Sequence, residues 1–197
     1  IIGENILVCS TTLFIKNPNK EGFVSYHQDA KYIGLEPHNW VTAWVAITNS
    51  NENNGCMKMW PKSHLNIKEH NEKFNEGNLL TRGQTVENVP DDEVRSIELK
   101  AGQMSLHHPR IVHGSGVNMS NDRRIGFVIQ SYIGTNVRQT LGKNSVQIAR
   151  GEDKFQNHEV INRVKSLMSK ESILLKKKEN DYLQEIFYKG AKQKSSY

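Results

Sequence analysis

The sequence has only two cysteines, Cys9 and Cys56, among its 197 residues. Two thiols are too few for a disulfide framework or a zinc knuckle, so we expect both to be buried and reduced. The chain also lacks the run of about 20 apolar residues that a membrane-spanning helix needs. It shows no pattern of a secretory leader either. These absences favour a cytoplasmic protein with no membrane partner.

The chain has little excess charge of a kind that would indicate nucleic-acid binding. Its formal net charge is +5 and its isoelectric point is near 9.1, but much of the excess lies in "KSLMSKESILLKKKEND" and "YKGAKQKSSY". No basic motif with interleaved aromatic residues accompanies it. We interpret the excess as a solvated helix face and expect no nucleic-acid partner.

The length suits one domain with its own hydrophobic core. The first residue, Ile1, leads directly into the strand-like "ENILVCSTTLFIK". We therefore expect the chain to lack its natural N-terminal part.

Helical periodicity is scarce before about Glu159, and residues 1–135 read as short strands separated by turns. In "WVTAWVAIT", for example, Thr42 and Trp44 alternate with Val41 and Ala43. The pattern predicts a mainly β fold, either an antiparallel barrel or a double-sheet jelly roll. We place this core at residues 1–155 and a C-terminal extension of one or two amphipathic helices at residues 156–197.

The segment "YHQDAKY" places a histidine and an aspartate two residues apart. On a strand, His27 and Asp29 would share one face. A third candidate ligand, His113, ends an apolar strand just before the turn of Gly114 and Ser115. Two histidines and one carboxylate form the ligand set of non-haem Fe(II) oxygenases. Zinc is the competing metal, but the helical HExxH typical of zinc hydrolases is absent.

The other histidines are weaker candidates. We expect His38 to be the most plausible of them for lining a site, whereas His64 would hold a turn. His70 and His158 read as ordinary surface or core residues. His107 and His108 alternate in direction beside Pro109, and we predict that both lie outside the metal shell.

An iron oxygenase that uses O2 also needs a source of two electrons, which a 2-oxo acid supplies on decarboxylation. The distal carboxylate of such a cosubstrate calls for a bidentate cation, for which arginine is better suited than lysine. Arg123 and Arg124 begin the strand "RRIGFVIQSY". Arg124 shares its face with Gly126, which would leave space beside it. This favours Arg124, although both arginines could equally lie at the surface.

Several segments in the same order resemble the phytanoyl-CoA dioxygenase family of Fe(II)/2-oxoglutarate oxygenases, particularly its branch of chlorinating enzymes. They are "FVSYHQDAKYIGLEP", "VTAWVAI", "NGCMKMWPKSH" and "AGQMSLHHPRIVHGSGVNMSNDRRIGF", and the likeness spans roughly residues 5–155. The one departure is "PKSH" in place of the usual PGSH turn.

The resemblance implies a double-stranded β-helix, a cupin-like jelly roll. It implies that iron is bound by three residues, His27, Asp29 and His113. As the residue that binds 2-oxoglutarate, the resemblance selects Arg124, which lies eleven residues beyond His113. It also places Trp44 near the cosubstrate, with Ser115 and Lys16 as further helpers.

Asp29 bears on the type of reaction. Halogenating members of the branch replace this carboxylate with a small residue and bind chloride in its place. The intact motif therefore predicts hydroxylation of an unactivated C–H bond, with release of succinate and CO2. The alternatives are a halogenase-like enzyme acting on a carrier-tethered amino acid, and an inactive jelly-roll binding module.

The resemblance suggests a small, polar, amino-acid-like substrate, either free or bound to a carrier protein. Three polar residues are candidates to meet an anionic or zwitterionic substrate: Lys31, Arg82 and Gln84. As ordinary loop residues they would have no such role. The sequence leaves the oligomeric state open.

Overall fold

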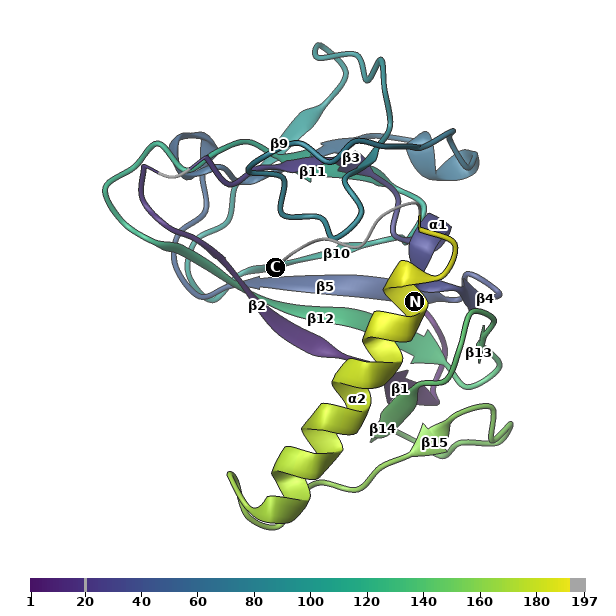
Figure 1. Cartoon of the computed structure of the whole chain (residues 1–197). Helices are drawn as coiled ribbons and strands as arrows, with labels where there is room; N and C mark the ends of the chain where they lie inside the picture. The colour runs from purple at the N-terminus through teal and green to yellow at the C-terminus, as the bar shows by residue number, and fades with distance from the viewer. Residues whose placement is uncertain (20, 192–197) are drawn as a thin grey trace.

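The computed structural model describes residues 1–19 and 21–191, and two β-sheets packed face to face form its centre (Figure 1). The large sheet has the strand order β10-β5-β12-β1-β14-β15, and β2 pairs with β12 beside this path. Its strands are β1 (Ile6–Val8), β2 (Thr11–Lys16), β5 (Trp40–Ala46), β10 (Met104–His107), β12 (Arg124–Gly134), β14 (Ser145–Arg150) and β15 (Glu159–Val160). All its pairings are antiparallel except that of β14 with β15.

The small sheet has the order β3-β11-β6-β9. Its strands are β3 (Val24–His27), β6 (Met57–Trp60), β9 (Arg95–Ile97) and β11 (Val112–Ser115). Two short pairs lie outside the sheets: β4 (Leu35–Glu36) with β13 (Arg138–Gln139), and β7 (Asn71–Glu72) with β8 (Gln84–Thr85). The helical elements are α1 (Ala30–Ile33), η1 (Glu52–Asn54), η2 (Ser63–Leu65) and α2 (Lys170–Tyr188). The predicted fold class, a double-stranded β-helix with helical structure after it, is confirmed.

The alternation in β5 sorts the large sheet into an inner and an outer face. Residues directly opposite each other on antiparallel strands point to the same side. Trp44 lies opposite Val128 of β12, and both pack with Ala46 and with Met57 of the small sheet. This cluster fills the space between the two sheets, so the predicted alternation of β5 is confirmed.

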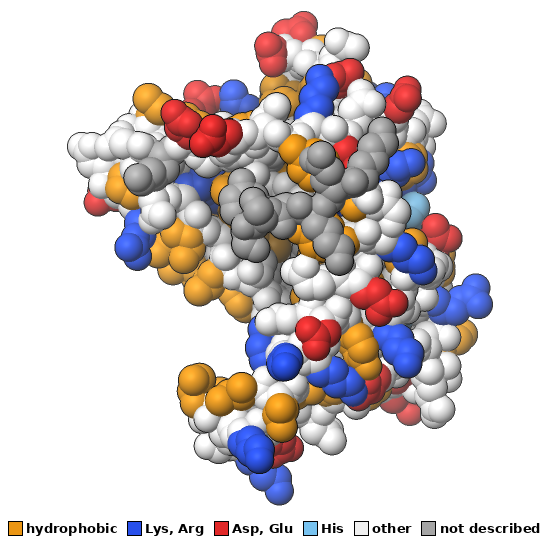
Figure 2. All heavy atoms as spheres, in the orientation of Figure 1, with side chains coloured by type: hydrophobic (Ala, Val, Ile, Leu, Met, Phe, Trp, Pro, Cys, Tyr) orange, Lys and Arg blue, Asp and Glu red, His pale blue; other side chains and the backbone are white. Residues whose placement is uncertain are grey.

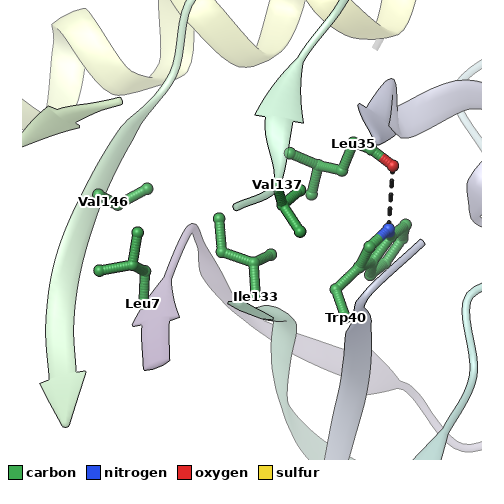
Figure 3. Close-up of a cluster of buried hydrophobic side chains, with 6 residues drawn as sticks. All are labelled: Leu7, Leu35, Trp40, Ile133, Val137 and Val146. Atoms are coloured by element: carbon green, nitrogen blue, oxygen red, sulfur yellow. Dashed lines mark hydrogen bonds between the residues drawn. The ribbon is translucent and has the colours of Figure 1, made fainter. Parts of the chain in front are cut away.

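A second hydrophobic cluster closes one end of the large sheet (Figure 3). The indole of Trp40 is 1% exposed and donates a hydrogen bond from Nε1 to the backbone oxygen of Leu35 at 3.1 Å. Buried tryptophans of this kind need a partner for the indole N–H. The remaining members, drawn from β1, β12, β14 and a neighbouring loop, are Leu7, Ile133, Val137 and Val146. The cluster therefore joins three regions that are distant in sequence, around residue 7, residues 35–40 and residues 133–146.

The C-terminal extension differs from its prediction. Residues 159 and 160 form β15 beside β14, and the backbone N–H of Ile161 donates to Val146 at 2.8 Å. The helix begins only at Lys170, after Ser169, whose side chain accepts from the backbone of Ser172. The expected helix start near Glu159 was therefore wrong, because the apolar residues there extend the sheet. The boundary after residue 155 stays a prediction, and residues 192–197 lie outside the described residues.

Acidic and basic side chains are interspersed over the face of the molecule drawn in Figure 2. Both cysteines are free, as expected, but only Cys56 is buried, whereas Cys9 is partly exposed; desolvation of its thiol raises the pKa of Cys9 to about 12. Within the described ranges, no helix is long and apolar enough to cross a membrane.

Candidate metal centre and cosubstrate cavity

Two histidines from neighbouring strands and one aspartate come together between the sheets. His27 at the end of β3 lies opposite His113 of β11 in the strand register, with ring centroids 4.3 Å apart. The Oδ1 atom of Asp29 is 3.4 Å from Nε2 of His27 and 3.9 Å from Nε2 of His113. One ligand atom from each residue lies within 4.8 Å of the others.

Asp29 does not continue β3, contrary to the expectation that it shares a strand face with His27. The strand ends at His27, and Asp29 is the first residue of the turn into α1. Its backbone has helical angles, φ −56° and ψ −40°. The carboxylate reaches the histidines because the chain turns inward at this point.

Gln28, between the two ligands, anchors this turn. Its side chain is completely buried and its Oε1 accepts from the backbone N–H of Lys68 at 2.7 Å. Its backbone N–H donates to Nε2 of His70 at 3.0 Å, which gives His70 a structural role. The amide nitrogen donates to three backbone oxygens, those of Ser63, Asn66 and Arg110. A buried amide satisfied at both ends fixes the direction of the chain on either side of it.

The hydrogen bonds of the two histidines leave their Nε2 atoms free for a metal. Nδ1 of His27 donates to the backbone oxygen of Ser25 at 2.9 Å, and Nδ1 of His113 donates to that of Ile111 at 3.1 Å. A carbonyl oxygen only accepts, so each Nδ1 carries the proton and each Nε2 keeps its lone pair. Such bonds commonly orient metal-binding histidines.

The charge state of the cluster also fits a divalent cation. Burial lowers the pKa of His113 to about 3, so its ring is neutral at physiological pH. Burial alone would raise the pKa of Asp29, but His113 and His27 outweigh it and hold that pKa well below its ordinary value. A partly buried carboxylate beside neutral imidazole nitrogens is a set of deprotonated ligands ready for a metal.

Arg124, the first residue of β12, lies at the same inner face. Its side chain is 2% exposed and donates from Nη2 to the backbone oxygen of Gly55 at 3.0 Å. Its Nε has no hydrogen-bond partner among the described residues, and its guanidinium lies 5.1 Å from the ring of Trp44. A buried cation with unused donors fits a carboxylate group.

Lys16 lies opposite Arg124 on β2 and holds the segment after His113. Its Nζ donates to Oγ of Ser115 at 2.7 Å and to the backbone oxygens of Ser115 and Gly116. Burial, with the positive charge of Arg124 as the next cause, lowers the pKa of Lys16 to about 7. The buried ammonium is therefore easily deprotonated.

Gly126 has a different role from the one expected. A Cβ at this position would overlap the indole of Trp44, so the glycine makes room for the Trp44 ring and not for Arg124 directly. Because Trp44 lies next to Arg124, this packing still determines the wall of the site.

A single cavity joins the predicted site residues. Six of them line it: His27, Asp29, Trp44, His113, Ser115 and Arg124. The seventh, Lys16, contacts Ser115 from outside the lining. The other walls come from a loop that includes Leu80 and from α2 through Lys176, Asn180, Leu183 and Phe187.

The three predicted substrate contacts have different positions. Gln84 lines the cavity. Arg82 instead forms an ion pair with Glu72 and donates to the backbone oxygen of Lys189 beyond the end of α2, so its role is structural. Lys31 and His38 are not among the described residues that line the cavity.

Two further residues of the inner face were missed as site residues. Oγ1 of Thr42 lies 3.1 Å from Oδ2 of Asp29. His107 lies opposite Thr42 on β10, and its Nε2 is 3.9 Å from the same oxygen. Burial lowers the pKa of His107 to about 4. The alternation of β5 could have identified Thr42, because it shares the face of Trp44.

Residues 1–126 match the phytanoyl-CoA dioxygenase family, and this chain belongs to that family. It is 28% identical over 128 residues to the human peroxisomal phytanoyl-CoA dioxygenase, an alignment covering 62% of this chain and 38% of the human protein. A probable α-ketoglutarate-dependent hypophosphite dioxygenase of Stutzerimonas stutzeri is 27% identical over 144 residues, covering 72% of this chain and 50% of that protein. The chain thus spans half or less of the length of these two relatives.

Among solved structures, the non-heme monooxygenase ThoJ in its apo form superposes with a TM-score of 0.79 and 29% identity. The match covers 94% of this chain, including most of the C-terminal extension, and 68% of ThoJ. A nickel complex of ThoJ matches with a TM-score of 0.74 and 27% identity, covering 92% of this chain and 66% of ThoJ.

Proposed function

We propose that this chain is an Fe(II)/2-oxoglutarate-dependent dioxygenase that hydroxylates a C–H bond of a small polar, amino-acid-like substrate. The observation that carries the proposal is the set of two buried histidines and the partly buried Asp29, whose ligand atoms converge in one cavity with the buried guanidinium of Arg124. This donor set is the facial triad of non-haem iron oxygenases. Membership of the phytanoyl-CoA dioxygenase family supports the same cofactors.

In this proposal, metal binding and cosubstrate binding are assigned to different residues of the chain. His27, Asp29 and His113 would hold the iron, and Arg124 would bind the distal carboxylate of 2-oxoglutarate. When bound, iron with 2-oxoglutarate and O2 supplies the oxidising chemistry, which converts the cosubstrate to succinate and CO2 and leaves one oxygen atom on the substrate. The ring of Trp44 lies beside the guanidinium of Arg124, and Lys16 holds Ser115 through a hydrogen bond. Orientation and exclusion of water are the contributions that a scaffold of this kind makes.

Asp29 favours hydroxylation over halogenation. Its carboxylate supplies the third protein ligand, in the place that a halide would need. The carboxylate is also held from behind by Thr42, so it is well placed to remain a ligand. A carrier-tethered substrate is compatible with the same site chemistry.

Polar side chains among the mainly apolar lining of the cavity support a substrate that carries polar groups. Polar side chains reach it from three separate elements: Gln84 of β8, Gln130 of β12 and Asn180 of α2. The family itself does not dictate the substrate, since the names of the two relatives given above refer to a coenzyme A thioester and to hypophosphite.

The test is to supply the purified chain with Fe(II), 2-oxoglutarate, O2 and chloride, together with a panel of amino acids and carrier-bound aminoacyl groups. Mass spectrometry should find a product heavier by one oxygen atom and an equal amount of succinate. A chlorinated product would refute the hydroxylase assignment. Absence of succinate from a protein that binds metal would favour the inactive binding module.

A further inference from the structure

The carboxylate of Asp29 presents its two oxygens to different partners. Oδ1 faces the Nε2 atoms of His27 and His113, as a metal-binding oxygen would. Oδ2 faces the large sheet, where its neighbours are Oγ1 of Thr42 at 3.1 Å and Nε2 of His107 at 3.9 Å. The two oxygens therefore have separate environments.

Thr42 alone does not satisfy Oδ2. A hydroxyl has one proton to donate, and Oγ1 of Thr42 lies 2.9 Å from the backbone oxygen of Gln130 as well as 3.1 Å from Oδ2. The proton is thus shared between two acceptors, one of them the partly buried carboxylate of Asp29. Charged acceptors of this kind normally bind two or more donors.

The imidazole of His107 carries an N–H group that donates to no other described residue. The residue is 5% exposed, and neither of its ring nitrogens has a hydrogen-bond partner among the described residues. Buried polar atoms without partners are uncommon and call for an explanation. Its ring also lies 4.8 Å from the ring of His113, so it stands directly behind the metal ligands.

We propose that His107 is a positioning residue whose Nε2–H binds Oδ2 of Asp29, so that Asp29 meets the metal through Oδ1 alone. The present 3.9 Å separation exceeds an ordinary N–H···O distance of about 2.9 Å by roughly 1 Å. The proposal therefore requires a small rotation of one of the two side chains. The proposal rests on the proposed function, because it assumes a metal at the site.

The consequence is a site that binds metal more tightly and with one carboxylate oxygen. Partners that orient a metal ligand typically contribute about 10–100-fold to metal affinity or activity. A one-oxygen ligand also leaves more coordination positions for 2-oxoglutarate and O2.

The test is to titrate the purified chain with Mn(II) alone and to measure free Mn(II) by electron paramagnetic resonance. His107→Phe keeps a ring of similar size but removes both nitrogens, and should weaken Mn(II) binding by about tenfold. His107→Gln places an amide N–H near the position of Nε2 and should recover most of that loss. Ser105→Ala is the matched control, because Ser105 lies on the same strand and face with an equally unpartnered buried hydroxyl.

Unchanged Mn(II) affinity in a folded His107→Phe variant would overturn this proposal and leave the proposed function standing. Failure of the wild-type chain to bind Mn(II) would overturn both. A measurement on the wild-type chain avoids any folding defect of the variants. In the Zn(II)-loaded protein, nitrogen-15 spectra of the imidazoles should show His107 protonated at Nε2, and protonation at Nδ1 alone would overturn the proposal.

Discussion

Replacing Arg124 with methionine should abolish tight binding of 2-oxoglutarate without changing metal affinity. Methionine keeps an unbranched apolar stem but removes the charge and every donor. Arg124 is 2% exposed and already gives one N–H to Gly55, so its remaining donors are available at the wall of the cavity that it lines. The cosubstrate carboxylate would lose Arg124, the one arginine among the described residues that line the cavity.

The size of the effect follows from the burial. Removing one partner of a buried, hydrogen-bonded charge pair costs about 2–5 kcal/mol. At 1.4 kcal/mol for each factor of ten, a mid-range loss of about 3 kcal/mol weakens binding by roughly 100-fold. Some of the loss is offset because the variant no longer buries an arginine.

The assay is anaerobic calorimetry of 2-oxoglutarate binding to the Mn(II)-loaded protein. The matched control is Arg123→Met, because Arg123 is the preceding residue, is exposed, and points to the opposite face. We expect the control to bind 2-oxoglutarate like the wild type. The reasoning is refuted if Arg124→Met binds 2-oxoglutarate within about threefold of the control while its Mn(II) affinity is normal.

Three further predictions concern residues around this site. The pKa of Lys16 is lowered to about 7 in the free protein, and a bound carboxylate would raise it. Binding then takes up a proton, so 2-oxoglutarate affinity should fall by up to tenfold per unit as the pH rises above about 7, and Lys16→Met should flatten this profile in calorimetry. Gly126→Ala forces the ring of Trp44 to move and should raise the Michaelis constant for 2-oxoglutarate severalfold, as measured by succinate release. Gln28→Leu strips four backbone groups, which meet the fully buried Gln28 amide, of their partner and should lower the free energy of unfolding by about 4 kcal/mol in urea denaturation.

Each of these has a contradictory outcome. An identical pH profile in wild type and Lys16→Met would show that the charge of the cosubstrate does not change the pKa of Lys16. A Gly126→Ala variant with normal kinetics would mean that Trp44 does not shape the binding wall. Loss of less than about 1 kcal/mol in Gln28→Leu would remove the anchoring role of the amide.

The β-rich architecture could be predicted because strand alternation is a local property of the sequence. Thr42 and Trp44 share a face in "WVTAWVAIT", and the structure places both toward the small sheet. The helix start was wrong for the opposite reason. Whether the residues after Glu159 join a sheet depends on β14, which lies elsewhere in the chain, and local periodicity carries no information about that partner.

The positions of the predicted metal ligands were accessible because the motif is short and its chemistry specific. The inward turn that brings Asp29 to the site could not be predicted, since it depends on contacts between Gln28 and segments far along the chain. His107 was set aside because Pro109 interrupts the phase between it and His113. Only the pairing of β10 with β5 places its ring behind Asp29.

The central claim is that His27, Asp29 and His113 hold the Fe(II) with which the chain converts 2-oxoglutarate to succinate. The most direct measurement is oxygen-dependent succinate formation by the Fe(II)-loaded chain, compared with its Asp29→Ala and His113→Ala variants. The account predicts succinate from the wild type in air, none without O2, and a loss of at least about 100-fold in both variants. Equal succinate formation by a folded Asp29→Ala variant, or none by a wild-type chain that binds Fe(II), would contradict it.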